Sequence, residues 1–213
     1  MMRQTERVFT TCSHGEMMQK LFRCLDPVDR IFSNNGDIAN EHVSDHSAKK
    51  AAILVPIFLG ISTWQILLTK RAEHLSNHAG QVSFPGGKHE PSDGNLVETA
   101  LREALEEVGL EPSNVSIAGG LSPVRSPAGF FVQPIVGLVV VQNSLNSFTP
   151  DPSEVDTIFT LPLAHIINQD NFSLIQRKTD GKRNDYWVVK HDVHHIWGLS
   201  ARVLWDFQKR LDN

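Results

Sequence analysis

The sequence is poor in cysteine, has no excess of basic residues and lacks a long uninterrupted apolar stretch. Its 213 residues include two cysteines, Cys12 and Cys24, which are too few for a zinc cluster or a disulfide framework. We therefore expect a reducing, cytoplasmic environment. The formal net charge is -4 and the pI is near 6.2. Without a basic surface, nucleic acid is not expected as the main partner.

Secretion and membrane insertion are not expected either. Residues 1–20 lack the apolar segment of a signal peptide, and the longest apolar stretch, residues 51–68, is interrupted by Pro56, Gly60 and polar side chains. Hydrophobic residues still make up 40% of the chain, which is enough for one substantial core. We expect a soluble globular protein that acts on a small molecule.

The chain divides into two predicted parts. Residues 1–48 are expected to form an N-terminal arm and linker, partly flexible, with a short helix from Gly15 to Leu25 and a polar linker over residues 33–50. Residues 49–213 are expected to form the folded domain. The arm would serve in oligomerisation or remain disordered, and the pattern leaves a homodimer open.

Strand and helix patterns alternate along the domain. We predict strands over residues 51–60, 63–69, 80–87, 115–124, 130–142, 172–178 and 185–197. Residues 153–168 are expected to form a short helical or turn segment, and residues 200–211 a final helix with Val203, Leu204, Phe207 and Leu211 on one face. The pattern predicts an α+β fold, an α-β-α sandwich with a mixed sheet between an acidic helix and the C-terminal helix.

The acidic helix is predicted from about Asn95 to Val108, with Ser92 and Asp93 as caps and Gly109 as its end. Helical spacing gathers an apolar stripe on one face, and three glutamates on the other. The stripe contains Val97, Leu101, Ala104, Leu105 and Val108, and the glutamates are Glu103, Glu106 and Glu107.

The glutamates have the spacing of a metal site. Glu103 and Glu107 are one turn apart, so their carboxylates project side by side, with Glu106 on the flank. A hard divalent cation would remove their repulsion, and oxygen ligands favour Mg²⁺ or Mn²⁺. Arg102 can fix one of these carboxylates, and the Gly86–Gly87 turn allows close approach of the backbone. A solvated acidic face is the simpler alternative for the glutamates alone.

Residues 102–110, REALEEVGL, resemble the core of the Nudix box at every defined position. The glycine that opens this motif corresponds to Gly87, one residue further from Arg102 than usual, and Asp93 stands where a glutamate is usual. Upstream, residues 67–87 resemble a second signature, that of the coenzyme A diphosphatases of the Nudix superfamily, the NudL-like group. The matching positions are Leu67, Leu68, Thr69, Arg71, Ala72, Gly80 and Phe84 to Gly87, whereas Ser76 replaces an arginine of that signature.

This resemblance, over roughly Ala51 to Phe207, implies a Nudix-type sandwich that hydrolyses a diphosphate linked to another group. It implies Mg²⁺ or Mn²⁺ on Glu103 and Glu107, with Glu106 as a further ligand or as a residue that supports the ligands without touching the ion. The resemblance places the general base on the helix or on a later loop, where Glu154 is the candidate. The alternative for Glu154 is a non-catalytic role, as a glutamate in the first turn of a helix. Substrate binding is expected from Arg71, Lys70, His78, Gly86 and Gly87.

Three functions follow from the resemblance. The first is cleavage of coenzyme A or a derivative to 3′,5′-ADP and 4′-phosphopantetheine. The second keeps the chemistry but takes another nucleoside diphosphate derivative, such as ADP-ribose. The third is a catalytically silent nucleotide-binding domain, which the presence of all three helix glutamates disfavours. The spacing of His191 and His195 also invites a metal site, although structural histidines are the expected reading in a strand or turn.

Overall fold

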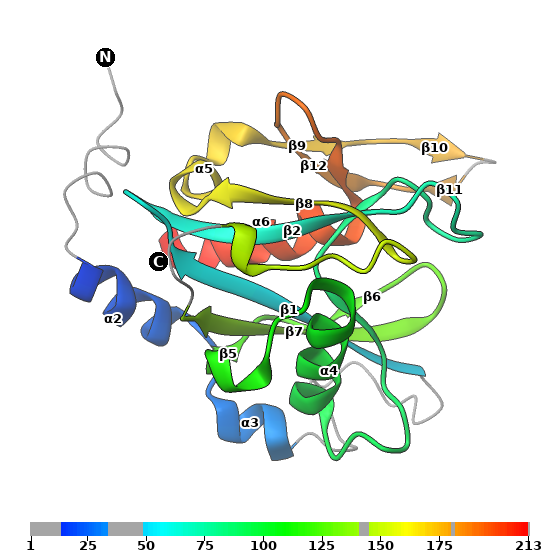
Figure 1. Cartoon of the computed structure of the whole chain (residues 1–213). Coiled ribbons are helices and arrows are strands. Elements are labelled where there is room, and N and C mark those ends of the chain that lie inside the picture. Colours follow the sequence, from blue (N-terminus) through cyan, green and yellow to red (C-terminus); the bar gives the residue numbers. More distant parts are fainter. Residues whose placement is uncertain (1–13, 34–48, 141–144, 180–181, 213) are drawn as a thin grey trace.

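The computed structural model describes residues 14–33, 49–140, 145–179 and 182–212, and a mixed sheet lies at its centre (Figure 1). Eight strands form this sheet: β1 (Lys49–Leu59), β2 (Trp64–Arg71), β3 (Val82–Ser83), β4 (Gly86–Lys88), β5 (Val115–Gly120), β6 (Val124–Arg125), β7 (Phe130–Val139) and β8 (Val155–Pro162). Their order is β3-β2-β1-β7-β5, with β4 beside β1, β6 beside β7 and β8 beside β2. β1 and β7 run parallel, and the other pairs are antiparallel.

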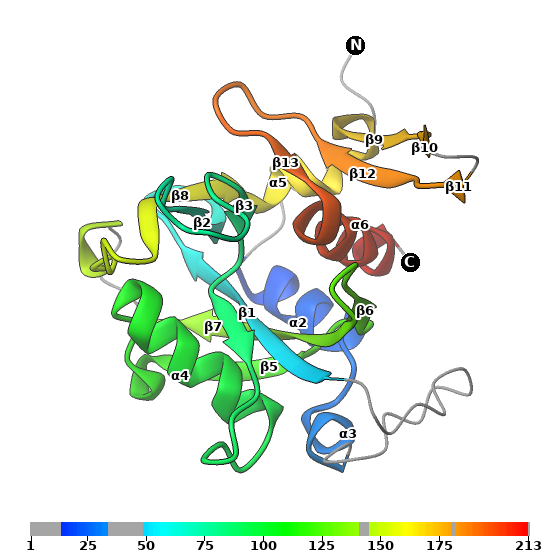
Figure 2. The same ribbon diagram turned by 90° about the vertical axis from the view of Figure 1, so that its right-hand side faces the viewer.

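Both faces of the sheet are buried, which explains the nearly continuous apolar sequence of β1. Its alternate side chains enter two different cores: Ile53, Val55 and Ile57 on one face, and Leu54 and Phe58 on the other. Helix α6 (Gly198–Asp212) covers the first face and helix α4 (Leu96–Val108) the second. Figure 2 shows the two helices on either side of β1. The predicted α-β-α sandwich of the α+β class is confirmed.

Helix α4 has different caps from those predicted. Asn95 is the N-cap, because its side chain accepts the Glu98 N–H, and the Glu98 carboxylate in turn accepts the N–H of Gly94. The prediction that Ser92 and Asp93 cap the helix is therefore wrong. Gly109 ends the helix as predicted, with φ 66° in the left-handed region.

The apolar stripe of α4 is shifted from its predicted position. Val97, Ala104 and Val108 are buried, but Leu105 is 37% exposed, whereas Glu107 is buried. The helix is therefore rotated so that one acidic side chain faces the sheet.

The predicted N-terminal helix is confirmed as α2 (His14–Cys24), and α3 (Val28–Ser33) follows it without having been predicted. Met17 and Leu21 of α2 are buried in the same core as α6. Arg210 links α6 to the end of α2, since it donates to Asp26 at 3.0 Å and to the Cys24 carbonyl at 3.2 Å. The predicted linker falls almost wholly on residues 34–48, outside the described residues, and the division of the chain at residue 48 stays a prediction.

The segment predicted as helix or turn over residues 153–168 is mostly strand. Strand β8 pairs with β2 through seven residue pairs, and only α5 (Leu163–Ile167) is helical. The misleading feature is its partial burial, with exposed Asp156 and Thr157 interrupting the apolar alternation. Three other predicted strands are each divided in two: residues 80–87 correspond to β3 and β4, residues 115–124 to β5 and β6, and residues 185–197 to the strands Tyr186–Val189 and Ile196–Trp197. The rest are present, with changed ends.

A smaller three-stranded sheet packs its inner face on α6. It contains β9 (Phe172–Ile175), β12 (Tyr186–Val189) and β13 (Ile196–Trp197), and the pair β10 (Lys178–Thr179) and β11 (Lys182–Arg183) lies next to it. Short 3-10 turns occur at Pro112–Asn114, Leu145–Ser147 and Gln169–Asn171. In the described ranges, no helix has the length and apolar character needed to cross a membrane.

Candidate active site

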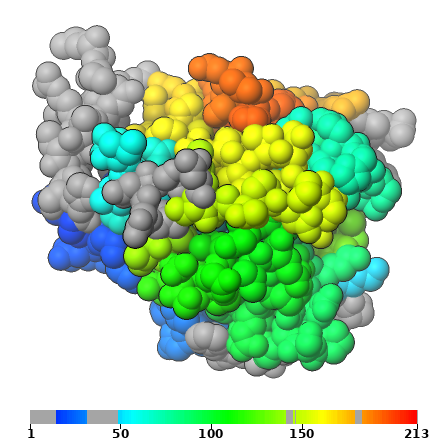
Figure 3. Space-filling model, viewed as in Figure 1, coloured from blue at the N-terminus to red at the C-terminus, as the bar shows by residue number. Residues whose placement is uncertain are grey.

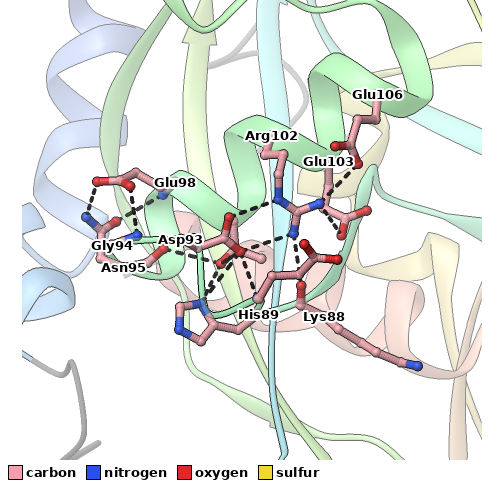
Figure 4. A network of polar contacts seen from close by, with 11 residues as sticks. Lys88, His89, Asp93, Gly94, Asn95, Glu98, Arg102, Glu103 and Glu106 are labelled. Carbon is pink, nitrogen blue, oxygen red and sulfur yellow. Dashed lines mark hydrogen bonds and ion pairs between the residues drawn. The ribbon is translucent and has the colours of Figure 1, made fainter.

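Arg102 is the centre of a polar network at the start of α4 (Figure 4). Its Nε and one terminal nitrogen donate to the two oxygens of Asp93, at 2.9 and 3.1 Å. The other terminal nitrogen donates to Glu103 and Glu106, both at 3.0 Å. The Lys88 carbonyl accepts a further bond at 3.0 Å. The predicted pairing of Arg102 with the acidic cluster is therefore seen, and Arg102 holds two of the three glutamates in place.

Asp93 is the main partner of Arg102, a role that the sequence did not indicate. Its carboxylate also accepts the Thr99 hydroxyl at 2.9 Å and the Glu90 N–H at 2.9 Å. Hydrogen bonding from Arg102 holds the pKa of Asp93 well below its usual range, despite the opposing effect of burial. The signal available in the sequence was its place in the motif, where an acidic residue is usual.

Glu107 is the most buried of the three glutamates. Its side chain is 2% exposed, and its Oε1 lies 3.7 Å from a terminal nitrogen of Arg71. Its Oε2 is buried and has no hydrogen-bond partner within the part of the chain that the structure describes. Burial raises the pKa of Glu107 to about 8; Arg71 opposes that shift, whereas Glu154 and Glu103 add to it. The prediction that Glu107 lies on the exposed side of the helix is wrong.

Glu103 and Glu106 stand further from the core. The Glu103 side chain is 15% exposed, and burial raises its pKa, against the effect of Arg102. Glu106 is 53% exposed at the rim. A Cβ on Gly87 would lie 2.4 Å from a Glu103 carboxylate oxygen, so glycine leaves room for this carboxylate in the position that it occupies here.

Gly86 supports the same corner from the other side of the turn. Its φ of 154° and the 2.4 Å approach of a built Cβ to the Ala52 carbonyl both require glycine. Its backbone N–H donates to Glu107 and partly offsets the rise in the pKa of that carboxyl. The predicted close approach of the Gly86–Gly87 backbone to the acidic helix is therefore seen in the structure.

Glu154 lies near these glutamates although it is distant in sequence. It ends a turn directly before β8, so the alternative reading as a first-turn helix residue is wrong. The turn is tied to α4, because the Asp151 N–H donates to the Glu107 carbonyl at 3.0 Å. The Glu154 charge raises the pKa of both Glu103 and Glu107. Figure 3 shows the segment around residues 150–160 lying against α4 on one face.

Arg71 ends β2 at an irregularity in the register between β2 and β8. Besides its 3.7 Å contact with Glu107, its Nε is buried and has no hydrogen-bond partner. The Ala72 N–H donates to the Glu154 carbonyl at 2.8 Å, which brings the ends of these two segments together. Arg71 therefore faces the acidic cluster, with donor capacity to spare.

The other predicted binding residues lie apart from the carboxylates. Lys70 pairs with Glu73 at 2.8 Å and Asp156 at 3.4 Å, and the hydrogen bond to Glu73 raises its pKa. His78 is exposed, with a φ of 57°, and its Nδ1 lies 3.0 Å from the Gln81 side-chain oxygen. Neither has a described contact with α4, so the structure does not join them to the glutamates. Their substrate-binding roles stay predictions.

The acidic cluster fits a hard cation only after a side-chain movement. Across residues 14–33, 49–140, 145–179 and 182–212, no three His, Cys, Asp or Glu side chains already converge as a metal site. Glu103 and Glu106 are turned to Arg102 instead. Glu107 nevertheless keeps a buried oxygen with no hydrogen-bond partner among the described residues, and the charges of Glu103 and Glu154 raise its pKa, so the cluster offers carboxylate oxygens of the kind that hard cations bind.

The histidines near residue 191 make structural contacts. The Nδ1 of His191 accepts the N–H groups of Val193 and His194, at 3.2 and 3.0 Å. The His194 ring stacks on Phe159 with centroids 3.8 Å apart. These contacts favour a structural role for the histidines of this segment over a metal site.

Comparison with known proteins gives consistent matches. The family model described as the NUDIX domain matches residues 49–189. A protein from Yersinia pestis (strain Pestoides F), named an uncharacterized Nudix hydrolase NudL, is 36% identical over 167 residues, covering 78% of this chain and 82% of its own. A protein of the same name from Yersinia pseudotuberculosis serotype O:1b gives the same values. A solved MutT/nudix family protein from Enterococcus faecalis is 15% identical, with TM-score 0.47, covering 95% of this chain and 76% of that one.

Proposed function

The chain belongs to the Nudix hydrolases, which act on pyrophosphate bonds, and from this premise we propose that it cleaves the diphosphate of coenzyme A or a derivative. The products would be 3′,5′-ADP and 4′-phosphopantetheine. The observation that carries the proposal is the buried Glu107 carboxylate, with one unpartnered oxygen, facing Arg71 at the end of the second signature. Such a pair can hold a cation and a diphosphate next to each other.

Nudix hydrolases generally use divalent metal ions, and we propose Mg²⁺ or Mn²⁺ here, held by Glu107 and Glu103. Glu106 would be a further ligand or would support the ligands through Arg102. When bound, the ion supplies neutralisation of diphosphate oxygens and acidification of a water. Glu103 must turn away from Arg102 to serve, and Arg102 keeps its bonds to Asp93 during that movement.

The protein's own side chains then divide the work. Arg71 is proposed to donate to a diphosphate oxygen through its guanidinium group, whose buried Nε has no hydrogen-bond partner among the described residues. Glu154, beside Glu103 and Glu107, is proposed to take the proton of the attacking water. The water oxygen forms a bond to one phosphorus, the bridging P–O bond breaks, and the bridging oxygen leaves with the other phosphate. Gly86 and Gly87 keep the backbone close enough for this arrangement.

A second substrate class keeps the chemistry and changes the ligand. Ser76 occupies the place of a signature arginine, and it is exposed and accepts a bond from the Asn77 side chain at 3.2 Å. This lost positive charge favours a less phosphorylated substrate such as ADP-ribose. A catalytically silent domain is less favoured, because Glu103, Glu106 and Glu107 are all present and two are held by Arg102.

Hydrolysis of a substrate panel tests the proposal. Purified protein is incubated with coenzyme A, ADP-ribose or a nucleoside triphosphate, with Mg²⁺, Mn²⁺ or chelator, and the products are separated by chromatography. We expect metal-dependent release of 3′,5′-ADP from coenzyme A. Cleavage of ADP-ribose alone would contradict the coenzyme A proposal while supporting the chemistry. No cleavage of any substrate would favour the silent domain.

The setting of the protein is also a proposal. The low cysteine content supports a cytoplasmic location. A small nucleotide-derived molecule is the partner that the family supports. Homodimer formation and the role of residues 1–48 stay predictions.

A further inference from the structure

Two lysines share one aromatic ring on the α6 side of the sheet. Lys49 begins β1, Lys88 ends β4 and Phe130 begins β7. The Nζ atoms of Lys49 and Lys88 both lie 5.7 Å from the centroid of the Phe130 ring. This distance is within the range of cation–π attraction, which is about 6 Å. Three neighbouring strands thus each contribute one residue to a single cluster, the Lys49–Lys88–Phe130 cluster.

Strand register builds this cluster. Lys49 pairs with Phe130 across β1 and β7, and Lys88 pairs with Ala51 across β4 and β1. Paired residues project from the same face of a sheet, which here is the face that carries Ile53 and α6. Ala51 offers only a methyl group between the outer strands, so the Lys88 side chain can cross β1 toward Phe130. The convergence is therefore fixed by the backbone.

The cluster carries two positive charges, and no carboxylate of the described residues pairs with them. Both lysines are exposed. One ring attracts an exposed ammonium only weakly, and it does not neutralise the charge. The two like charges also repel each other. A group with two negative charges, such as a phosphate monoester, would relieve this repulsion and bind both donors.

The cluster lies next to the proposed active site along the chain. Lys88 follows Gly87, whose α-carbon abuts the Glu103 carboxylate, and the Lys88 carbonyl accepts a bond from Arg102. Figure 4 shows the Lys88 side chain leading away from the Arg102 network. Among the described strands β4 pairs with β1 alone, so it is an edge strand. Glu103 lies on the α4 side of the sheet and the cluster on the α6 side, so a ligand that reaches both has to pass round this edge.

We propose that Lys49 and Lys88 bind a phosphate group which the substrate carries outside its diphosphate, namely the ribose 3′-phosphate of coenzyme A. This inference rests on the proposed function and makes the two lysines a determinant of specificity. It also supplies positive charge that Ser76 does not provide. Dephospho-coenzyme A, which has the same diphosphate without the 3′-phosphate, would lack this interaction.

Kinetics with the two substrates test the inference. Wild type is expected to show kcat/KM for coenzyme A at least about tenfold higher than for dephospho-coenzyme A. The double variant Lys49→Met/Lys88→Met should reduce this ratio to near one, through a higher KM for coenzyme A. Equal kcat/KM values in wild type, or an unchanged ratio in the double variant, would overturn the inference. Lys190→Met, which removes another exposed lysine, is the matched control and should keep the wild-type ratio.

Product binding separates this inference from the proposed function. Calorimetry with Mg²⁺ compares 3′,5′-ADP with AMP, which differ only in the 3′-phosphate. We expect wild type to bind 3′,5′-ADP at least about tenfold more tightly, and the double variant to bind the two alike. If neither coenzyme A nor dephospho-coenzyme A is cleaved, the proposed function fails, and the binding difference still decides the role of the lysines. Equal Kd values in wild type would refute that role.

Discussion

Arg102 and Arg71 contact the carboxylates of α4 in contrasting ways. Arg102 has a partner for every nitrogen: both oxygens of Asp93, two glutamates and a backbone carbonyl. Arg71 makes one contact of 3.7 Å to Glu107 and keeps a buried Nε without a partner. The first network is complete without a ligand and acts as a frame. The second is incomplete, so a bound ion and diphosphate would complete it.

The largest effect on activity is expected at Glu107, which faces Arg71 and is the proposed metal ligand. Glu107→Gln keeps the shape of the side chain but removes the negative charge proposed to hold the cation. We expect kcat to fall by about 10³-fold in Mg²⁺ or Mn²⁺, because charge stabilisation by the ion is worth several kcal/mol. Steady-state kinetics measure the fall, with circular dichroism to confirm folding. Folded protein with wild-type kcat would remove Glu107 from the metal site.

Arg71→Met tests whether the spare donors of Arg71 serve the substrate. Loss of a charged hydrogen bond to the diphosphate should lower kcat/KM by about 10- to 100-fold. Lys190→Met is the matched control, because Lys190 is an exposed cation outside the predicted binding residues. We expect the control to change kcat/KM far less. Equal losses of kcat/KM in both variants would mean that Arg71 has no particular role in binding the diphosphate.

Asp93→Asn breaks the complete network without touching the proposed ligands. The variant keeps the size of the side chain but removes its charge and one of the two acceptor oxygens that face Arg102. We expect about a tenfold loss in kcat, because Arg102 no longer holds Glu103 and Glu106 as firmly. Asp93→Glu, which restores the charge, should recover part of the activity. A loss of thermal stability with unchanged kcat would show that the Arg102 network stabilises the fold but does not contribute to catalysis.

The smallest effect concerns the stability of the metal-free protein. Burial raises the pKa of Glu107 from 4.5 to about 8, so the folded state keeps a proton that the unfolded state has lost. Below pH 4.5 both states are protonated; between the two values wild type loses stability as pH rises, and above pH 8 the loss is complete. Glu107→Gln has no carboxyl at this position, so its stability should not fall in this way as the pH rises.

Thermal unfolding in chelator at pH 5, 7 and 9 measures the difference. The variant's Tm should match wild type at pH 5 and exceed it by several degrees at pH 9. A Tm difference that stays constant across the three pH values would contradict the assignment of the shift to Glu107.

Local patterns predicted much of this molecule. The apolar sequence of β1 and β2, the last helix and the motif from Arg102 to Leu110 all depend on near neighbours in the chain, and each prediction is confirmed. The burial of Glu107 was missed because helical spacing fixes relative directions but not how the helix is rotated on the sheet. β8 was missed because its exposed residues hide the strand period.

Contacts between distant segments could not be predicted. Asp93 reaches Arg102 because the loop before α4 folds back, which no periodicity encodes. Glu154 approaches α4 through a turn held by backbone bonds. Lys49, Lys88 and Phe130 meet only through the register of three strands, and β1 joins β7 across a long stretch of sequence. Such contacts depend on tertiary structure.

The ion pair between Arg210 and Asp26 has a consequence for biosynthesis. The two residues are 184 positions apart, and α2 packs against α6. A ribosome adding roughly 5–20 residues per second needs on the order of ten to forty seconds to make the intervening chain. Until then Met17 and Leu21 of α2 lack the apolar neighbours that α6 provides, so this part of the core can close only after α6 has been made.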